Sequence, residues 1–448
     1  MSSEPIISVS GLRGIVGKSL TPAVVDRYIR AFADQLPPGD VVVTRDGRAS
    51  GARFAQVVHG TLAACGRTAR DGGIAATPTT GVLVRQFGAA GGVQISASHN
   101  PPQYNGLKLF SGAGRVLPAS AGEQVLARYR ALTAASPVDE PATTARPIAD
   151  PSARHLELVL ATVDVGRIAA RNFNVLLDAN HGAGSVLGIP LLEALGCRVT
   201  VLGGQPDGQF AHPPEPTAEN LASVTALVLE AQADVGFCQD PDADRLAIID
   251  AGGRYLGEEY TLALCVENVL RSTPGPVVTN CATSRMSEEI AARFGVPFFR
   301  SAVGEANVVD VMLAQGAVIG GEGNGGAIDP RVGLVRDSFV GMALVLDAMA
   351  SRDAPVAQLT GALPRYAMCK TKIELPPERL ASALAALEAH FSDARVERLD
   401  GLRLDWPQAW LLVRPSNTEP IVRAIAEAPT SQQAAALCAQ AERVLRGA

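Results

Sequence analysis

The 448-residue sequence contains few aromatic side chains and no long uninterrupted hydrophobic run. Aromatic residues make up 4% of the chain and hydrophobic residues 47%, so the cores must consist mainly of Ala, Val and Leu. A membrane-spanning helix needs ~20 consecutive apolar residues, and the N-terminus has neither the basic start nor the apolar core of a signal peptide. We therefore expect a cytoplasmic protein without a membrane partner.

Basic residues are not in excess, because 39 Lys and Arg stand against 45 Asp and Glu, for a net charge of −6. A nucleic-acid-binding protein would present a basic surface, so no nucleic-acid partner is expected, and positive charge for an anionic ligand must be local to a cleft. The seven cysteines are scattered and form no CxxC pair, which is typical of free thiols in a reducing compartment.

Strand-like and helix-like segments alternate along much of the chain. Apolar runs at residues 41–44, 175–178 and 277–278 are each followed by a segment with helical periodicity. Such alternation predicts parallel strands covered by helices on both faces. A segment rich in Ser, Ala, Pro and Thr at residues 133–152 marks a first domain boundary.

The pattern changes near Pro364 to a strand, a helix, three short strand-like runs and a closing helix, which indicates an α+β unit. Taking ~150 residues per domain as a guide, we expect four domains. Their predicted bounds are residues 1–150, 151–252, 253–364 and 365–448. The predicted fold class is α/β, with three similar α/β units followed by the α+β unit.

The aspartate loop (residues 240–244) offers carboxylates at alternate positions, Asp240, Asp242 and Asp244. Such spacing lets three carboxylates converge on a hard cation. A calcium-binding EF-hand is excluded, because Arg245 and Ala251 stand where that loop needs Gly and Glu. A solvated acidic turn is the alternative, but two strand-like runs flank the loop and three uncompensated carboxylates would repel one another. The pattern favours Mg²⁺, and Arg245 suits an anionic substrate.

The serine loop (residues 96–102) follows an apolar run at residues 92–95 and ends in a double proline. Open α/β sheets bind ligands beyond the carboxyl ends of their strands. Ser98, beside His99, is therefore a candidate phosphoryl carrier, although a Ser–His pair alone is common. Arg13 and Lys108 are further cations of this region, and each taken alone is equally compatible with a surface role.

The glycine loop (residues 320–326) has the sequence GGEGNGG and lacks the Lys-Ser/Thr ending of a P-loop. Glycines allow a ligand to approach the backbone closely, and Glu322 and Asn324 offer groups suited to sugar hydroxyls. A flexible turn is an equally good interpretation of this segment taken alone.

The arginine loop (residues 414–420) combines a guanidinium with hydroxyl and amide donors. This combination favours a phosphate site, and a plain β-turn between two strands is the alternative. The candidate residues are Arg414, Ser416, Asn417, Thr418 and, just beyond the loop, Arg423.

Gly182, Gly184 and Gly188 follow a strand-like run and are reminiscent of a dinucleotide-binding fingerprint. Their spacing is GxGxxxG, and the acidic residue expected after the next strand is missing. The sequence therefore argues against a nicotinamide enzyme.

Taken in order, the four loops resemble those of the α-D-phosphohexomutase superfamily, which includes phosphoglucomutase, phosphomannomutase and phosphoglucosamine mutase. The corresponding family motifs are S/T-A-S-H-N-P, D-G-D-G-D-R, G-E-x-S-G and R-x-S-G/N-T-E-P, and the resemblance spans essentially the whole chain. It implies four domains around a central cleft, with three similar mixed α/β sheets sandwiched by helices and a C-terminal α+β domain.

The resemblance also implies roles for the candidate residues. Ser98 would be the phosphoserine, and one Mg²⁺ would be held by its phosphate together with the three aspartates. Arg13, Lys108 and Arg245 would stabilise the transferred group. Glu322 and Asn324 would select the sugar. The non-reacting phosphate would be held by Arg414, Ser416, Asn417, Thr418 and Arg423.

The sequence departs from the family pattern at two places. Asn324 and Gly326 stand where many members have Ser and His, a form similar to that of archaeal-type sugar phosphomutases, including phosphoglucosamine mutases. A third-domain Lys-Cys-Thr stretch appears here as residues 281–283 without the lysine, and a nearby Gly-His pair appears as Gly304-Glu305. Glu305 and His99 are therefore the candidates for the acid and base.

The activity implied is interconversion of hexose 1-phosphate and hexose 6-phosphate through a phosphoserine enzyme and a sugar bisphosphate. The first candidate is a phosphoglucosamine mutase, and the second is a phosphomannomutase/phosphoglucomutase of broad specificity. A Mg²⁺-dependent phosphatase and a non-catalytic sugar-phosphate sensor are remote alternatives. The expected partners are small hexose phosphates, with the chain acting as a monomer or homodimer.

Overall fold

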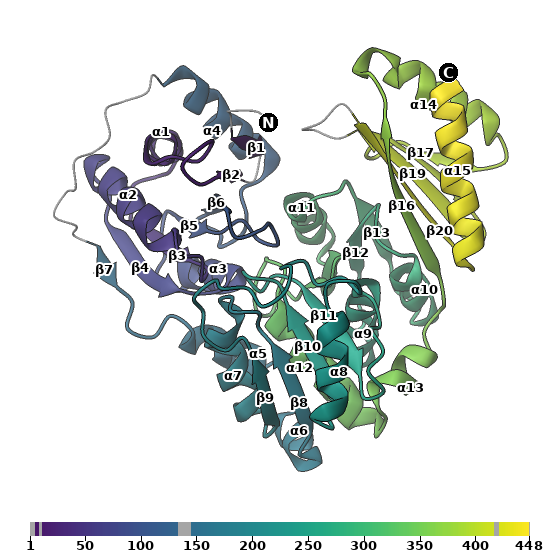
Figure 1. Cartoon of the computed structure of the whole chain (residues 1–448), viewed down its shortest axis with the longest axis horizontal. Helices are drawn as coiled ribbons and strands as arrows, with labels where there is room; N and C mark the ends of the chain where they lie inside the picture. Colours follow the sequence, from purple (N-terminus) through teal and green to yellow (C-terminus); the bar gives the residue numbers. More distant parts are fainter. Residues whose placement is uncertain (1–4, 9–10, 133–144, 416–420, 448) are drawn as a thin grey trace.

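The computed structural model describes residues 5–8, 11–132, 145–415 and 421–447. Within these residues the chain forms four sheets, each covered by helices, that follow one another along the sequence. Figure 1 shows the first unit facing the C-terminal unit across the top of the molecule, with the second and third units below them. The predicted fold class is confirmed.

The first sheet has seven strands in the order β1-β2-β6-β5-β3-β4-β7. Strands β3, β4, β5 and β7 run parallel, whereas β6, β2 and β1 add antiparallel pairs at one side. The elements of this unit are β1 (Ile6–Ser8), β2 (Gly11–Ile15), α1 (Pro22–Ala33), β3 (Val41–Arg45), α2 (Gly51–Ala64), β4 (Ala69–Ile74), α3 (Thr77–Gln86), β5 (Gly91–Ile95), β6 (Tyr104–Ser111), α4 (Ala119–Ala131) and β7 (Arg146–Pro147).

The second sheet has the strand order β11-β10-β8-β9, with β11 antiparallel to β10 and the others parallel. The sharp return between β10 and β11 is the aspartate loop, so strand pairing fixes that loop at the end of a buried hairpin. The elements are α5 (Ala153–Leu160), α6 (Val165–Arg171), β8 (Asn174–Asp178), α7 (Gly184–Ala194), β9 (Arg198–Leu202), α8 (Ala222–Glu230), β10 (Val235–Gln239) and β11 (Leu246–Asp250).

The third sheet has the order β13-β12-β14-β15, and the glycine loop joins the antiparallel strands β14 and β15. Its elements are α9 (Glu258–Ser272), β12 (Val277–Asn280), α10 (Met286–Arg293), β13 (Phe298–Ser301), α11 (Glu305–Gln315), β14 (Ile319–Glu322), β15 (Gly326–Ile328), α12 (Ser338–Arg352) and α13 (Val356–Gly361). Helix α12 is buried along all but its last two residues. One continuous core joins this unit to the second, with α12 inside it.

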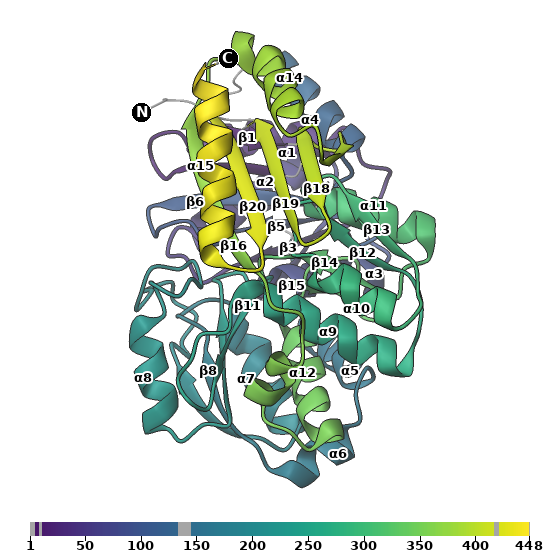
Figure 2. The same ribbon diagram turned by 90° about the vertical axis from the view of Figure 1, so that its right-hand side faces the viewer.

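The C-terminal sheet is wholly antiparallel, in the order β16-β20-β19-β18-β17, and has a core of its own. Figure 2 shows α14 and α15 on one side of this sheet. The elements are β16 (Ala367–Glu374), the 3₁₀ turn η1 (Pro377–Arg379), α14 (Leu380–His390), β17 (Arg395–Glu397), β18 (Leu402–Trp406), β19 (Ala409–Pro415), β20 (Ile421–Ala428) and α15 (Ser431–Gly447).

The structure differs from the sequence prediction in three details. The three α/β sheets are mixed, as the family resemblance implies, whereas the alternation of strands and helices alone predicted parallel strands and did not reveal the antiparallel hairpin or edge of each sheet. The helix expected after the first strand of the C-terminal unit begins with a 3₁₀ turn at Pro377–Arg379, and its α-helical part starts at Leu380. The C-terminal unit has four strands between its two long helices where three runs were predicted.

Candidate active site

The serine loop leaves β5 with Ser98 in the left-handed region of backbone space, at φ +50°. That conformation is uncommon for a residue other than glycine and persists only where the surroundings fix it. The backbone N–H of Ser98 donates to Ser96 Oγ over 2.9 Å, and the side chain of Ser98 is 4% exposed. The loop therefore presents the Ser98 hydroxyl in one fixed direction.

The buried side chain of Arg48 contacts the backbone of this loop. Its Nη2 donates to the carbonyl oxygens of Ser98 and Asn100, each over 2.6 Å. Its Nη1 donates to those of Pro101 and Tyr104 over 2.8 and 3.1 Å. A planar guanidinium with several fixed donors suits this task, so Arg48 holds four backbone carbonyl groups at one point.

Asp46 completes the support. Its Oδ2 accepts from Arg48 Nε over 3.0 Å and from Ser96 Oγ over 2.7 Å, and its Oδ1 accepts from the backbone N–H of Arg48. Asp46 and Arg48 follow β3, whereas Ser96 follows β5, which lies beside β3 in the sheet. The adjacent carboxyl ends of two parallel strands thus build the platform for Ser98.

The aspartate loop lies directly against Ser98. The Ser98 hydroxyl donates to Asp240 Oδ2 over 2.9 Å. Asp240, Asp242 and Asp244 are fully buried, and one oxygen of each lies within 4.8 Å of the others. Asp240 Oδ1 also accepts the backbone N–H groups of Asp244 and Arg245, each over 3.1 Å, which keeps the loop tightly curled.

Three buried carboxylates at this spacing fit a divalent cation. Asp242 Oδ1 and Asp244 Oδ1 are buried and have no hydrogen-bond partner among the described residues, as expected for oxygens reserved for a metal. Burial and the charges of Asp242 and Asp244 raise the pKa of Asp240. A bound cation would favour the ionised form of all three carboxylates.

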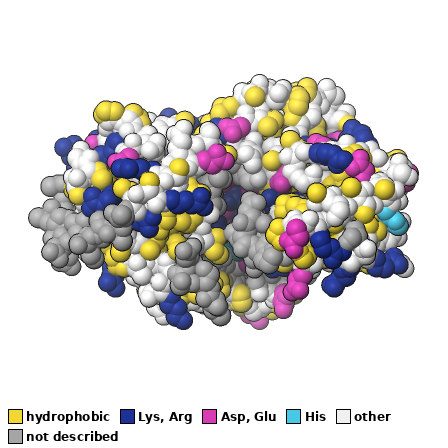
Figure 3. All heavy atoms as spheres, turned by 90° about the horizontal axis from the view of Figure 1, so that it is seen from above, with side chains coloured by type: hydrophobic (Ala, Val, Ile, Leu, Met, Phe, Trp, Pro, Cys, Tyr) yellow, Lys and Arg dark blue, Asp and Glu magenta, His cyan; other side chains and the backbone are white. Residues whose placement is uncertain are grey.

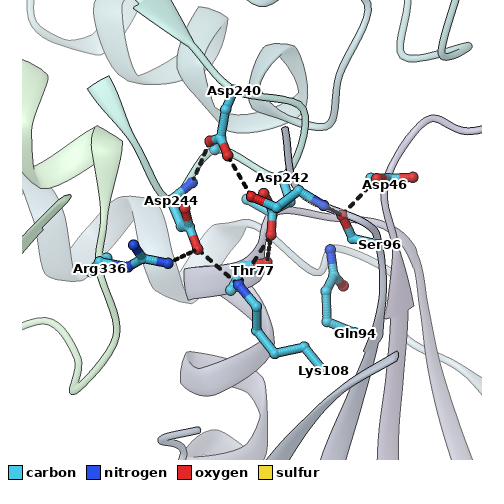
Figure 4. Close-up of polar contacts among 12 residues, drawn as sticks. Asp46, Thr77, Gln94, Ser96, Lys108, Asp240, Asp242, Asp244 and Arg336 are labelled. Atoms are coloured by element: carbon cyan, nitrogen blue, oxygen red, sulfur yellow. Dashed lines mark hydrogen bonds and ion pairs between the residues drawn. The ribbon is translucent and has the colours of Figure 1, made fainter. Parts of the chain in front are cut away.

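Lys108 approaches the same carboxylates from β6. Its Nζ lies 3.2 Å from Asp242 Oδ2 and 2.8 Å from Asp244 Oδ2, as Figure 4 shows. Burial would raise the pKa of Asp242, but the charge of Lys108 and a hydrogen bond from Thr77 Oγ1 outweigh it and lower that pKa. Lys108 therefore keeps Asp242 and Asp244 ionised.

Arg336, which the sequence analysis did not single out, connects the aspartate loop to the third unit. Each of its nitrogens meets a different carboxylate: Nε reaches Glu305 Oε2 over 2.7 Å, Nη1 reaches Glu322 Oε2 over 2.8 Å and Nη2 reaches Asp244 Oδ2 over 2.7 Å. Arg336 lies one residue before the N-cap of α12, where Asp337 accepts the N–H groups of residues 339 and 340.

His99 lies beside Ser98, and the predicted cations Arg245 and Arg13 lie close enough to His99 for their charges to affect it. His99 Nδ1 lies 3.2 Å from Ser98 Oγ. Burial and the charges of Arg245 and Arg13 lower the pKa of His99 to about 3, so its imidazole is neutral at physiological pH. Arg245 Nη1 lies 3.6 Å from Glu215 Oε1. Burial lowers the pKa of Arg13, which faces the charges of Asp242 and Arg245.

A cavity of about 520 Å³ opens beside His99 and reaches from the aspartate side of the molecule to the C-terminal unit. Figure 3 shows this face hollowed between the first and last units. The lining includes the predicted residues His99, Glu322, Asn324 and Arg423. It also includes groups that the sequence analysis missed: Glu215, Glu259, Asn280, Lys370 and Lys372.

Two predicted site residues, Glu305 and Arg414, are not among the described residues that line this cavity. Glu305, 8% exposed at the start of α11, is held by Arg336 and is not part of the cavity lining formed by the described residues. Arg414, on β19, pairs with Asp400 Oδ2 over 3.1 Å rather than facing this cavity. Ser416, Asn417 and Thr418 lie outside the described residues.

The chain matches, in order, four domain descriptions of the phosphoglucomutase/phosphomannomutase family. Alpha/beta/alpha domains I, II and III match residues 6–136, 153–253 and 258–366, and the C-terminal domain matches residues 371–444. These matches cover most of the chain and define an isomerase of the phosphohexomutase type.

Relatives agree over nearly the full length. A "Probable phosphoglucosamine mutase" of Thermococcus kodakarensis is 33% identical, covering 98% of each chain. A "Phosphoglucomutase/phosphomannomutase" of the same organism is 35% identical, covering 95% of this chain and 94% of the relative. The crystal structure of a phosphoglucomutase/phosphomannomutase family protein of Burkholderia thailandensis superposes with a TM-score of 0.85 at 26% identity, covering 99% and 98%. The chain belongs to the α-D-phosphohexomutase superfamily.

In the part of the chain that the structure describes, none of the helices has the length and apolar character needed to cross a membrane.

Proposed function

We propose that the protein interconverts hexose 1-phosphate and hexose 6-phosphate through phosphorylated Ser98 and a sugar bisphosphate, with an amino sugar phosphate as the first candidate substrate. The observation that carries this proposal is the Ser98 hydroxyl, which lies 2.9 Å from Asp240 and next to His99, a residue lining a cavity that Lys370, Lys372 and Arg423 also line. A phosphoglucomutase/phosphomannomutase of broad specificity is the second candidate, because a relative of that name is 35% identical.

Asp240, Asp242 and Asp244, together with a phosphate on Ser98, would hold one Mg²⁺. The two partnerless oxygens of Asp242 and Asp244 support this assignment. When bound, the ion would neutralise negative charge on the phosphoryl oxygens. Lys108 and Arg245 add positive charge at the same place from the chain itself, and the platform of Asp46 and Arg48 fixes the direction in which Ser98 points.

In the first half-reaction, a substrate hydroxyl attacks the phosphorus on Ser98 and loses its proton, while the bond from phosphorus to Ser98 Oγ breaks. Ser98 Oγ leaves with the electron pair and takes up a proton. The second half-reaction reverses these bond changes at the other end of the sugar. Most of the catalysis in phosphoryl transfer comes from positioning and charge neutralisation, which this rigid site supplies.

Glu305 is the group we assign to proton transfer. Its Oε1 is buried without a hydrogen-bond partner among the described residues, and burial raises its pKa, against the charge of Arg336. A carboxyl group with a raised pKa is better matched to a proton-transfer role near neutral pH. His99 has a lowered pKa, and its Nδ1 lies 3.2 Å from Ser98 Oγ. Because the Ser98 hydroxyl donates its proton to Asp240, His99 Nδ1 would act as the donor in this contact.

Replacement of Ser98 by Ala tests the proposal. We expect the S98A variant to fold and to lose interconversion of glucosamine 1-phosphate and 6-phosphate by at least ~10³-fold, because no acceptor for the phosphoryl group remains. Intact-mass measurement should show one phosphate on wild type and none on S98A. Ser382→Ala, on the surface of α14, is the matched control. Wild-type turnover by S98A would refute the phosphoserine route, and release of free phosphate instead of isomer would favour a phosphatase.

A further inference from the structure

Glu259 is a carboxylate of the cavity that the mechanism above does not use. It is the second residue of α9 and lines the cavity together with the loops that follow β12 and β14. Its Oε2 accepts the backbone N–H of Ser284 over 2.9 Å. No described residue donates a hydrogen bond to its Oε1 or places a cation within ion-pairing distance of it.

The other two carboxylates that line the cavity are already paired. Glu322 Oε2 meets Arg336 Nη1 over 2.8 Å, and its Oε1 accepts from Asn280 Nδ2 over 2.8 Å. Glu215 Oε1 lies 3.6 Å from Arg245 Nη1. Among the described lining residues, Glu259 is thus the carboxylate that lacks a cation, and a ligand could supply one.

The glycine loop is shaped to accommodate this carboxylate. A Cβ added to Gly323 would lie 2.0 Å from Glu259 Oε1, so no other residue at position 323 could coexist with this rotamer of Glu259. Gly323 is not among the residues with positive φ, so it is needed here for space and not for an unusual backbone conformation. Its neighbour Glu322 is the proposed sugar-selecting residue, which places Glu259 beside the position of the sugar ring.

The opposite wall carries the complementary charge. Lys370 and Lys372 on β16 and Arg423 on β20 line the C-terminal side of the cavity. The cavity therefore combines a basic wall, suited to phosphate, with one unpaired carboxylate beside the sugar loop. A substrate that carries both a phosphate and an ammonium group matches this distribution, whereas a neutral hexose phosphate leaves the carboxylate without a counter-charge.

We propose that Glu259, given room by Gly323, binds the ammonium group of a hexosamine phosphate and so selects amino sugar phosphates over neutral hexose phosphates. This assignment rests on the proposed mutase function and identifies a residue that sets its specificity. The environment of Glu259 also gives a reason for selectivity. Burial raises the pKa of Glu259 to about 8; the charge of Lys370 acts to lower this pKa, and the charges of Glu427 and Glu258 act to raise it. An ammonium group would stabilise the ionised carboxylate, and a hydroxyl would do so far less.

The test is Glu259→Gln measured with three substrates: the 1-phosphates of glucosamine, glucose and N-acetylglucosamine. Gln retains an oxygen for the Ser284 N–H, so the fold is expected to persist. We expect kcat/KM for glucosamine 1-phosphate to fall by on the order of 10- to 100-fold, the range for loss of a hydrogen bond to a charged group. The value for glucose 1-phosphate should change less than ~3-fold. N-acetylglucosamine 1-phosphate, which has the substituent without the charge, should behave like glucose 1-phosphate.

The matched control is Glu267→Gln, a change of the same kind on the same helix. Glu267 pairs with Arg271 and Arg352 and does not line the cavity, so E267Q should retain the substrate preference of wild type. Equal losses for all three substrates in E259Q would overturn the ammonium assignment while leaving the mutase function intact. Wild type that interconverts neither these sugar phosphates nor mannose 1-phosphate would refute the mutase function itself.

Discussion

At the scale of single residues, Arg336 is the point where the aspartate loop and the glycine loop are joined. Its three nitrogens each contact one carboxylate, from Asp244, Glu305 and Glu322, and its side chain is only 10% exposed. Burial alone would lower the pKa of Arg336, but the three carboxylates outweigh burial and hold it well above its usual value. Arg336 therefore fixes the spacing between the proposed metal ligands, the proposed base and the proposed sugar ligand.

Replacement of Arg336 by Lys separates this positioning from simple charge compensation. Lys keeps the positive charge but cannot donate in three fixed directions at once. We expect R336K to raise KM, because Glu322 loses its support, and to lower kcat/KM by on the order of 100-fold, measured by steady-state kinetics with circular dichroism to check folding. Kinetics like those of wild type would mean that the charge of Arg336 matters and its geometry does not.

The residues that could be predicted from sequence are those whose chemistry is gathered in one short loop. Asp240, Asp242 and Asp244 are neighbours along the chain, and the structure brings them to within 4.8 Å of one another beside Ser98. Arg48 and Arg336 could not be found this way, because the carbonyls and carboxylates that they contact lie between 14 and 92 residues away in the sequence. An isolated arginine has no local pattern that distinguishes a buried clamp from a surface charge.

At the scale of elements, the carboxyl ends of strands explain where the site is formed. Five strands lead directly into loops of the site at their carboxyl ends: β3, β5, β10, β12 and β14. Alternating strands and helices were predictable from periodicity, and the strands at residues 41–44, 175–178 and 277–278 lie within observed strands. Helix α12 escaped prediction because it is hydrophobic on nearly every side, and a helix buried all round lacks the amphipathic period.

An ion pair between His212, in the loop after β9, and Asp178, at the end of β8, forms only while the histidine is protonated. His212 Nε2 lies 2.8 Å from Asp178 Oδ2, and His212 Nδ1 lies 3.0 Å from the Pro213 carbonyl oxygen. Burial would lower the pKa of His212, but the hydrogen bond and charge of Asp178 outweigh burial and raise it. A raised histidine pKa contributes stability below the unfolded value of about 6.5, and this contribution is lost as pH rises through the folded pKa.

We therefore expect His212→Gln to destabilise the protein at pH 6 by roughly 1–3 kcal/mol, the range for a hydrogen bond to a charged group. The difference from wild type should shrink as the pH rises from 6 through the raised pKa of His212 and the wild-type histidine loses its charge. Thermal unfolding of both proteins across this pH range measures the effect. His390→Gln, an exposed position on α14, is the control, and a constant difference for H212Q at every pH would contradict the ion-pair explanation.

At the scale of the whole molecule, the cores do not follow the four sheets one to one. A single core joins the second and third units through α12, whereas the C-terminal unit has its own core. The C-terminal unit meets the third through a small apolar cluster of Cys281, Trp410 and Leu412. Polar contacts add to it, such as Arg285 N–H to Glu427 Oε1 over 3.1 Å and Val303 N–H to Asp400 Oδ2 over 3.0 Å. The predicted boundary near residue 252 therefore runs through a shared core, whereas the predicted boundary near residue 364 separates two cores.

This difference should be visible in unfolding, because both tryptophans, Trp406 and Trp410, lie in the C-terminal unit. Tryptophan fluorescence therefore follows that unit together with its junction to the third unit, where Trp410 packs against Cys281. Far-UV circular dichroism follows the whole chain. A substitution in one independent core should move only the transition of its own unit. Leu346, in α12, is fully buried in the shared core, and Leu411, in β19, is fully buried in the C-terminal core.

We expect Leu346→Ala, which removes buried methyl groups at a cost of roughly 2–5 kcal/mol, to lower the main circular-dichroism transition in urea without moving the fluorescence transition. Leu411→Ala should do the reverse and lower the fluorescence midpoint. The two substitutions are chemically identical, and both leucines are fully buried. If each substitution moves a different signal, the two cores unfold separately. If L346A shifts both signals together, the C-terminal unit unfolds with the rest of the molecule, and the boundary near residue 364 does not separate independent cooperative units.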